Sequence, residues 1–372
     1  MIFLILLRWL RCGSFTLLLC SASAFSAPDN SHPSMVIRTD RYITLKGGGQ
    51  LFVREVSLIS GQRSLYAPVL LIHGARVPGL ASFDLPVKGG SLAEDLARAG
   101  FQVYILDLRG YGKSSRPAEM DLPPNHSLPL IRTADAVNDL KITVRSIQMW
   151  SQSNRVSLLG WATGGQWGGA YASQYPHTVQ SLILYNSLYG GSSHHPTLGY
   201  GSPLDTPGHS GNFNTLKFGG WRLNTRKSLF TAWDNSIPVK DKSRWRDDAV
   251  KRAYGDAALD SDITSWDRTP PSFRAPTGAL ADSFELAMGR KQWSANSLVS
   301  VPVLFIRSAL DFWSRPEDVD AVLEDAPIAE AVLIPQATHF VHLDRSTSGR
   351  SFFLYSVIKF LTNQPTNQIN SE

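Results

Sequence analysis

Runs of apolar residues alternate with segments of helical spacing along most of the chain. Continuous apolar runs predict buried strands at 67–74, 101–108, 155–160, 181–186, 301–307 and 330–335. Apolar positions three or four residues apart predict helices at 91–100, 132–152, 317–325 and 349–363. Residues 41–58 alternate like two strands around a glycine turn. Strands that alternate with helices predict an α/β fold, in which helices cover both faces of a mostly parallel sheet.

Residues 190–298 interrupt this alternation. They are rich in Gly, Pro, Ser and Trp and contain no clear buried strand, while 190–211 resemble a long loop and 240–259 a helix. We expect a lid inserted into a core formed by 40–189 and 299–362. Its aromatic residues either line an apolar pocket or pack the lid onto the sheet, and its arginines either bind a carboxylate or face solvent. These residues are Trp221, Trp233, Trp245, Trp266, Trp293, Phe213, Phe218, Phe230, Phe273, Arg222, Arg226, Arg244 and Arg246.

The amino terminus has the pattern of a secretory signal. Arg8 and Arg11 precede the short apolar run "SFTLLLCSASAFSA", and the Ala-Ser-Ala sequence that ends at Ala24 has the form of a cleavage site. We therefore expect residues 1–24 to be a signal peptide and the protein to be exported, to a periplasm or outside the cell. An uncleaved membrane anchor and a lipoprotein signal ending at Cys20 are the alternatives. Cleavage would leave no stable membrane span and would remove both cysteines.

Composition and charge exclude several other classes. The 372-residue chain is 43% hydrophobic, and its formal charge of +5 falls to +3 without the two arginines of the signal. The basic residues are scattered, so we expect a small-molecule substrate or ligand and no nucleic-acid partner. Asp107 occupies the position where a phosphate-binding loop requires glycine, and His194, His195 and His209 lack accompanying carboxylates. No cofactor or metal is expected, and the sequence indicates no particular oligomeric state.

Five short motifs lie at the ends of the predicted strands. They are "LLIHG" (70–74), "DLRGYGKSSRP" (107–117), "LLGWATGGQWGG" (158–169), "LFIRSALD" (304–311) and "ATHFVHLD" (337–344). The third motif has the outline of a nucleophile elbow, Gly-x-Ser-x-Gly, but Ala162 stands at the central position. In this order the motifs resemble the α/β-hydrolase superfamily, in its lidded branch with esterase-, epoxide-hydrolase- and haloperoxidase-like members. The resemblance covers roughly residues 40–362.

The resemblance implies a role for several residues. His339 would be the base, Asp311 would orient it, and the backbone N–H groups of Ala75 and Thr163 would form an oxyanion hole. The nucleophile position, Ala162, holds neither Ser nor Asp. We expect the nearby His342 to pack on a helix face or contact Asp344.

Four interpretations of Ala162 stay open. Thr163 could supply the hydroxyl, although one residue of helix turns a side chain by about 100°. His339 could activate water or abstract a substrate proton without a covalent intermediate. The protein could be a catalytically silent binding protein, or the alanine could be an engineered replacement of serine. Because Asp311 and His339 occur together, we favour hydrolysis of an ester, amide or related bond in a small apolar substrate.

Overall fold

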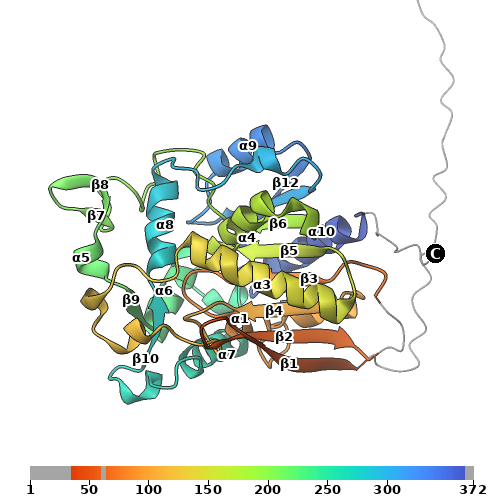
Figure 1. Ribbon diagram of the computed structural model, residues 1–372, viewed down its shortest axis with the longest axis horizontal. Helices are drawn as coiled ribbons and strands as arrows, with labels where there is room; N and C mark the ends of the chain where they lie inside the picture. Colours follow the sequence, from red (N-terminus) through yellow and green to blue (C-terminus); the bar gives the residue numbers. More distant parts are fainter. Residues whose placement is uncertain (1–34, 60–63, 365–372) are drawn as a thin grey trace, which may run out of the picture. The chain divides into compact units, whose positions relative to one another are not determined.

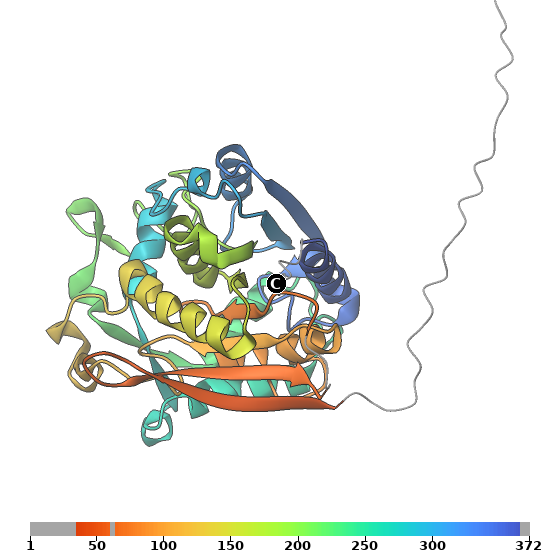
Figure 2. The ribbon, with the colours of Figure 1, turned by 45° about the vertical axis from the view of Figure 1, so that its right-hand side comes forward.

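The computed structural model describes residues 35–59 and 64–364, so the expected signal peptide lies outside the described residues. An eight-stranded sheet runs through these residues, with helices on both sides (Figure 1). Figure 2 shows the long hairpin of the first two strands along one edge of the sheet. In the described part of the chain, no helix has the length and apolar character needed to cross a membrane.

The sheet has the strand order β1-β2-β4-β3-β5-β6-β11-β12. The strands are β1 (Val36–Thr44), β2 (Gln50–Leu58), β3 (Val69–Ile72), β4 (Val103–Asp107), β5 (Val156–Trp161), β6 (Val179–Tyr185), β11 (Val303–Leu310) and β12 (Ala329–Thr338). β2 pairs antiparallel with β1 and β4, and the pairs from β4 to β12 are all parallel. The predicted mostly parallel sheet is therefore confirmed.

Helices bury both faces of this sheet. They are α1 (Gly79–Phe83), α2 (Leu92–Arg98), α3 (Thr133–Ser151), α4 (Thr163–Gln174), α9 (Pro316–Asp325) and α10 (Arg350–Thr362). Successive residues of a strand point to opposite faces. In β3, Val69 and Leu71 pack with α2 and α10, whereas Leu70 and Ile72 pack with α3 and α4. An apolar run such as "VLLI" is thus explained by burial on two sides.

The segment between β6 and β11 contains more regular structure than expected. It holds β7 (Asp205–Thr206), β8 (His209–Phe213), α5 (Thr215–Phe218), β9 (Trp221–Thr225), α6 (Arg226–Ser236), α7 (Asp248–Asp260), β10 (Ser272–Pro276) and α8 (Gly278–Ala287). The expectation of no buried strand was wrong, because β10 is buried along its whole length and pairs antiparallel with β9. A charged residue inside this strand hid it from the apolar pattern. Arg274 is only 7% exposed, and Asp262 neutralises it at 2.9 Å.

The lid tryptophans have different environments. Trp233 is fully buried and stacks on Phe340 with ring centroids 5.0 Å apart, and Trp293 is 7% exposed beneath α4. Trp266 is 53% exposed. Trp233 and Trp293 therefore pack the lid segment onto the core, as one of the two alternatives predicted.

Candidate active site

The turn between β5 and α4 bends sharply at Ala162. This residue has φ 52° and ψ −119°, a conformation that costs a non-glycine residue about 1–3 kcal/mol. A Cβ on Gly160 would lie 2.3 Å from the backbone of Gly164, and a Cβ on Gly164 would lie 2.1 Å from the Ile72 carbonyl oxygen. The Ala162 N–H donates to the Tyr185 carbonyl at 2.8 Å. The chain thus keeps a strained elbow at the carboxyl end of the sheet, with a methyl group at its apex.

Asp311 and His339 follow neighbouring parallel strands, and their side chains meet. β11 ends one residue before Asp311 and β12 ends one residue before His339. His339 Nδ1 lies 2.6 Å from Asp311 Oδ1, and the two side chains are 8% and 0% exposed. The carboxylate also accepts the backbone N–H groups of Trp313 and Ser314, at 3.1 and 2.9 Å. The carboxylate is therefore fixed as an acceptor for the imidazole.

The surroundings of His339 fix the orientation of its ring. Because Nδ1 donates to the carboxylate, Nε2 is the unprotonated nitrogen of the neutral ring. Nε2 has no hydrogen-bond partner among the described residues. The His339 carbonyl accepts the indole N–H of Trp161 at 3.0 Å and the hydroxyl of Tyr185 at 2.9 Å. The strand that carries the elbow and the loop that carries the base are thereby joined.

The loop after β3 lies against the elbow. A Cβ on Gly74 would lie 3.4 Å from the Cβ of Ala162. The next residue, Ala75, accepts the Tyr111 hydroxyl on its carbonyl at 3.0 Å, and its N–H has no acceptor within the described residues. Thr163 begins α4, and the first N–H groups of a helix have no intrahelical partner. The two expected oxyanion donors therefore belong to segments that touch.

His73 supports this loop as a neutral residue. Burial lowers the pKa of His73 to about 4. Its Nε2 accepts the Leu108 N–H at 3.2 Å, so its Nδ1 donates to the Gly74 carbonyl at 2.7 Å. A protonated ring could not accept from Leu108, and neutrality is thus part of the loop's construction.

The Thr163 side chain is not joined to the base. Thr163 is 2% exposed, and its hydroxyl has no hydrogen-bond partner in the described part of the chain. A hydroxyl nucleophile activated by His339 would need that hydrogen bond. The structure therefore brings Thr163 to the elbow by its backbone and leaves its hydroxyl apart from the Asp311–His339 pair.

The fold and these motifs match one family. A family model described as "alpha/beta hydrolase fold" matches residues 67–346. The chain belongs to the α/β-hydrolase fold family. The match spans the elbow, the lid segment, Asp311 and His339, and the fold class predicted from the sequence is confirmed.

Two curated relatives of this chain are lipases by name. The human (lyso)-N-acylphosphatidylethanolamine lipase is 28% identical over 147 residues, which cover 39% of this chain and 36% of that protein. Lipase 1 of Psychrobacter immobilis is 27% identical over 189 residues, covering 45% of this chain and 51% of that protein. The chain thus spans between about a third and a half of the length of these two relatives.

Solved structures agree on the fold of this α/β-hydrolase. An esterase from Rhodococcus sp. ECU1013 superposes with a TM-score of 0.54 at 16% identity, covering 88% of this chain and 99% of the esterase. At this identity the likeness describes the architecture alone.

Two residues near the site escaped the sequence prediction. Asn186 joins the ends of β6 and β11, because its side chain accepts the Ser308 N–H at 2.7 Å and donates to the Ser308 hydroxyl at 3.0 Å. Its Nδ2 also donates to the His339 carbonyl at 3.3 Å. A polar residue that ends an apolar strand was the available signal. Arg76, directly after Ala75, had no comparable signal because its partners come from the lid.

The second histidine of the last motif is structural. His342 is fully buried in a turn, not on a helix face, and its ring nitrogens bond to the Ser82 carbonyl and the Tyr185 hydroxyl, both at 3.1 Å. Burial lowers the pKa of His342 to about 3. The expected contact with Asp344 was wrong, because Asp344 accepts the Trp233 indole N–H at 2.8 Å.

The histidines of the 190–211 segment do not form a cluster. His195 Nε2 lies 3.0 Å from the Trp313 carbonyl, and His194 and His209 are exposed. Among residues 35–59 and 64–364, no group of three His, Cys, Asp or Glu side chains could hold a metal ion.

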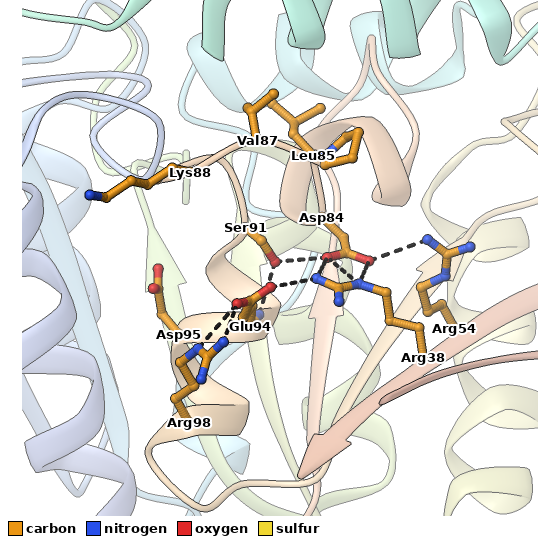
Figure 3. Close-up of a pocket in the computed structure, with 12 residues that line it drawn as sticks. Arg38, Arg54, Asp84, Leu85, Val87, Lys88, Ser91, Glu94, Asp95 and Arg98 are labelled. Atoms are coloured by element: carbon orange, nitrogen blue, oxygen red, sulfur yellow. Dashed lines mark hydrogen bonds and ion pairs between the residues drawn. The ribbon is translucent and has the colours of Figure 1, made fainter. Parts of the chain in front are cut away.

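A separate pocket lies at the amino-terminal hairpin (Figure 3). It has a volume of about 700 Å³ and contains none of the candidate site residues. Asp84 lies at its centre and binds Arg38 and Arg54, while Ser91 donates to the same carboxylate at 2.7 Å and Glu94 pairs with Arg38 at 2.8 Å. We call these five residues the Asp84 cluster. Its charges join β1 and β2 to α2.

Proposed function

We propose that this α/β-hydrolase-fold protein is exported and hydrolyses an ester, amide or related bond in a small, largely apolar substrate. The observation that carries the proposal is the 2.6 Å hydrogen bond between Asp311 and His339, next to an elbow that has kept its strained backbone. The lipase names of two curated relatives support the reaction class.

In this proposal water replaces the missing side-chain nucleophile. His339 Nε2 takes a proton from a water molecule as its oxygen attacks the carbonyl carbon. The carbonyl oxygen takes up the electron pair and is stabilised by the backbone N–H groups of Ala75 and Thr163. When the bond to the leaving group breaks, His339 returns the proton to the leaving oxygen or nitrogen. Asp311 holds the ring and stabilises its charged form during both transfers.

One observation favours a second function, that of a catalytically silent binding protein. The elbow carries a methyl group at Ala162, and the neighbouring Thr163 hydroxyl makes no hydrogen bond to the base. A protein that only binds its ligand would need neither a nucleophilic hydroxyl nor a hydrogen bond from that hydroxyl to His339.

An aryl-ester panel distinguishes the two functions. We expect the purified protein to turn over at least one ester above background, and His339→Ala to lower kcat/KM by about 10²–10⁴-fold. His177→Ala is the matched control, because this exposed histidine precedes β6 at the opposite end of the sheet. Ala162→Ser is the positive control, since it restores the hydroxyl on the existing elbow.

Each outcome has one meaning. Activity that disappears in His339→Ala supports hydrolysis without a serine. Silence of the native protein together with turnover by Ala162→Ser contradicts the proposed hydrolysis of these esters and supports the binding function. Turnover that survives in His339→Ala contradicts the proposed role of the base.

Export has its own test. Expression of the chain with residues 1–24 present, followed by mass spectrometry of the purified protein, should give a first residue directly after Ala24. A chain that keeps residues 1–24 would contradict the proposed cleavage.

A further inference from the structure

The lid meets the oxyanion loop through Arg76. Its Nε donates to the Asn224 side-chain oxygen at 3.1 Å and its Nη2 donates to the Ser228 hydroxyl at 2.9 Å. Both acceptors are neutral. Arg76 follows Ala75, the expected oxyanion donor, directly in the chain, so the backbone that carries this guanidinium is continuous with that donor. Within the described residues Arg76 has no carboxylate partner.

Arg222 leaves β9 on the same side as Asn224. Residues two apart on a strand share one face, and β9 pairs in register with β10, Arg222 opposite Ala275 and Asn224 opposite Phe273. Arg222 is half-buried, and within the described part of the chain it forms neither an ion pair nor a hydrogen bond. Its Nε is enclosed without an acceptor.

Asn224 adds a second unused donor at the same place. Asn224 is only 2% exposed, and its side-chain oxygen is occupied by Arg76. Its Nδ2 is buried and has no acceptor among the described residues. Buried donors without acceptors cost free energy and are uncommon in native proteins.

Several other lid arginines are neutralised by carboxylates. Arg226 pairs with Asp256, and Arg246 pairs with Asp234 at 2.6 Å. Arg222 has no such partner: burial and then the charge of Arg76 lower the pKa of Arg222 to about 10. At neutral pH both groups are therefore cations in a poorly solvated place, where a missing anion is costly.

We propose that Arg76, Arg222 and the Asn224 amide, which we call the Arg222 site, bind an anionic group of the substrate, a carboxylate or a phosphate. The inference rests on the proposed function for what happens at the neighbouring carbonyl, and it narrows the substrate class. A planar guanidinium recognises either anion by paired hydrogen bonds. The substrate is then an ester or amide that carries a negative charge close to the scissile carbonyl, with its apolar part elsewhere.

Binding tests this inference independently of turnover. Isothermal titration calorimetry is performed on His339→Ala, which holds the ligand without hydrolysis, using three probes: glutarate monomethyl ester, glutarate dimethyl ester and phenyl phosphate. We expect at least one anionic probe to bind about tenfold or more tightly than the neutral diester, and added salt to weaken that preference. The anionic probe that binds more tightly shows whether carboxylate or phosphate is the preferred group.

Variants locate the effect. Arg222→Met, added to the same background, should remove the preference for the anion and leave diester binding unchanged, whereas Arg222→Lys should retain part of it. Arg244→Met is the matched control, because Arg244 is an exposed lid arginine outside the Arg222 site, and it should change nothing. Thermal unfolding confirms that each variant is folded.

Two results would overturn the inference: equal affinity for charged and neutral probes, or an anion preference that survives in Arg222→Met. Failure of the proposed function is a different result. If the native protein turns over no ester but binds an anionic probe through Arg222, the inference holds for a binding protein. If the native protein hydrolyses neutral and charged esters equally, the proposed hydrolase function holds and the inference about the Arg222 site fails.

Discussion

The Asp84 cluster and the Arg222 site both gather arginines, but they treat charge in opposite ways. In the cluster, Arg38 pairs with Asp84 and Glu94, and Arg54 pairs with Asp84 (Figure 3). Arg54 also pairs with Asp40, which lies outside the cluster. At the Arg222 site, Arg76 donates to two neutral groups, and Arg222 has no hydrogen-bond partner or ion-pair partner among the described residues.

This difference separates charges that stabilise the fold from charges that do not. A carboxylate 1% exposed, like that of Asp84, is stable because several donors surround it. Two cations without a carboxylate give no such stability, and their presence is explained by a ligand. Separate measurements of stability and ligand binding, on variants of both regions, test this distinction.

The largest effect is expected for Asp84→Asn. This change leaves Arg38 and Arg54 without their shared counterion, and we expect the free energy of unfolding to fall by about 3 kcal/mol in denaturant titrations. Ester turnover per folded molecule should stay unchanged, because the cluster contains none of the site residues. A loss below about 0.5 kcal/mol would mean that solvent already screens these pairs.

The next largest effect on the free energy of unfolding is expected when an arginine is replaced by methionine, once in the Asp84 cluster and once at the Arg222 site. Arg38→Met should lower the free energy of unfolding by about 1 kcal/mol, because it removes a partner of a buried carboxylate. Arg222→Met should raise it by about 1 kcal/mol, because it removes an uncompensated cation. Chemical denaturation of both variants measures the sign, and a loss of stability in Arg222→Met would make that arginine a structural residue.

The smallest expected effect is the loss of stability at acidic pH that Glu94 causes. Arg38, followed by Arg98, holds the pKa of Glu94 below its ordinary value of 4.5. As pH falls, Glu94 is therefore protonated in the unfolded chain before it is protonated in the folded protein. The stability that Glu94 contributes is fully present above the ordinary pKa of 4.5, and it is lost as pH falls through the lower pKa of the folded state. Glu94 is partly exposed, and the loss should be below about 1 kcal/mol.

Two variants check this assignment. Between pH of about 5 and 3, stability should fall less in Glu94→Gln than in the parent, because the variant lacks the titrating group. Arg222→Met should follow the parent, since no carboxylate of the described residues pairs with Arg222. An altered acid slope in Arg222→Met would reveal a carboxylate partner.

The sequence predicted the parts of the molecule that are local. Within the predicted ranges 67–74 and 301–307, the uninterrupted apolar runs 69–72 and 303–306 form strand, because a parallel sheet buries both of their faces. Chain order then placed Asp311 and His339 after neighbouring strands, where their side chains meet at 2.6 Å.

The parts that depend on distant segments were not predictable. β9 and β10 are short, contain arginines and pair across nearly fifty residues, so no periodic apolar pattern marks them. The bonds from Arg76 to Asn224 and Ser228 exist only because the segment between β6 and β11 packs on the loop after β3. The orientation of the Thr163 hydroxyl likewise depends on packing around α4, which its sequence neighbours do not specify.

The strained backbone of Ala162 has a genetic consequence. Alanine and serine share the same Cβ, and at φ 52° that carbon already occupies the apex of the elbow. Codons of the form GCN and UCN differ by one base. Since Gly160 and Gly164 already permit the turn, a single nucleotide change would add an oxygen atom to a carbon already in position. The elbow of this protein is therefore one point mutation away from carrying a hydroxyl nucleophile.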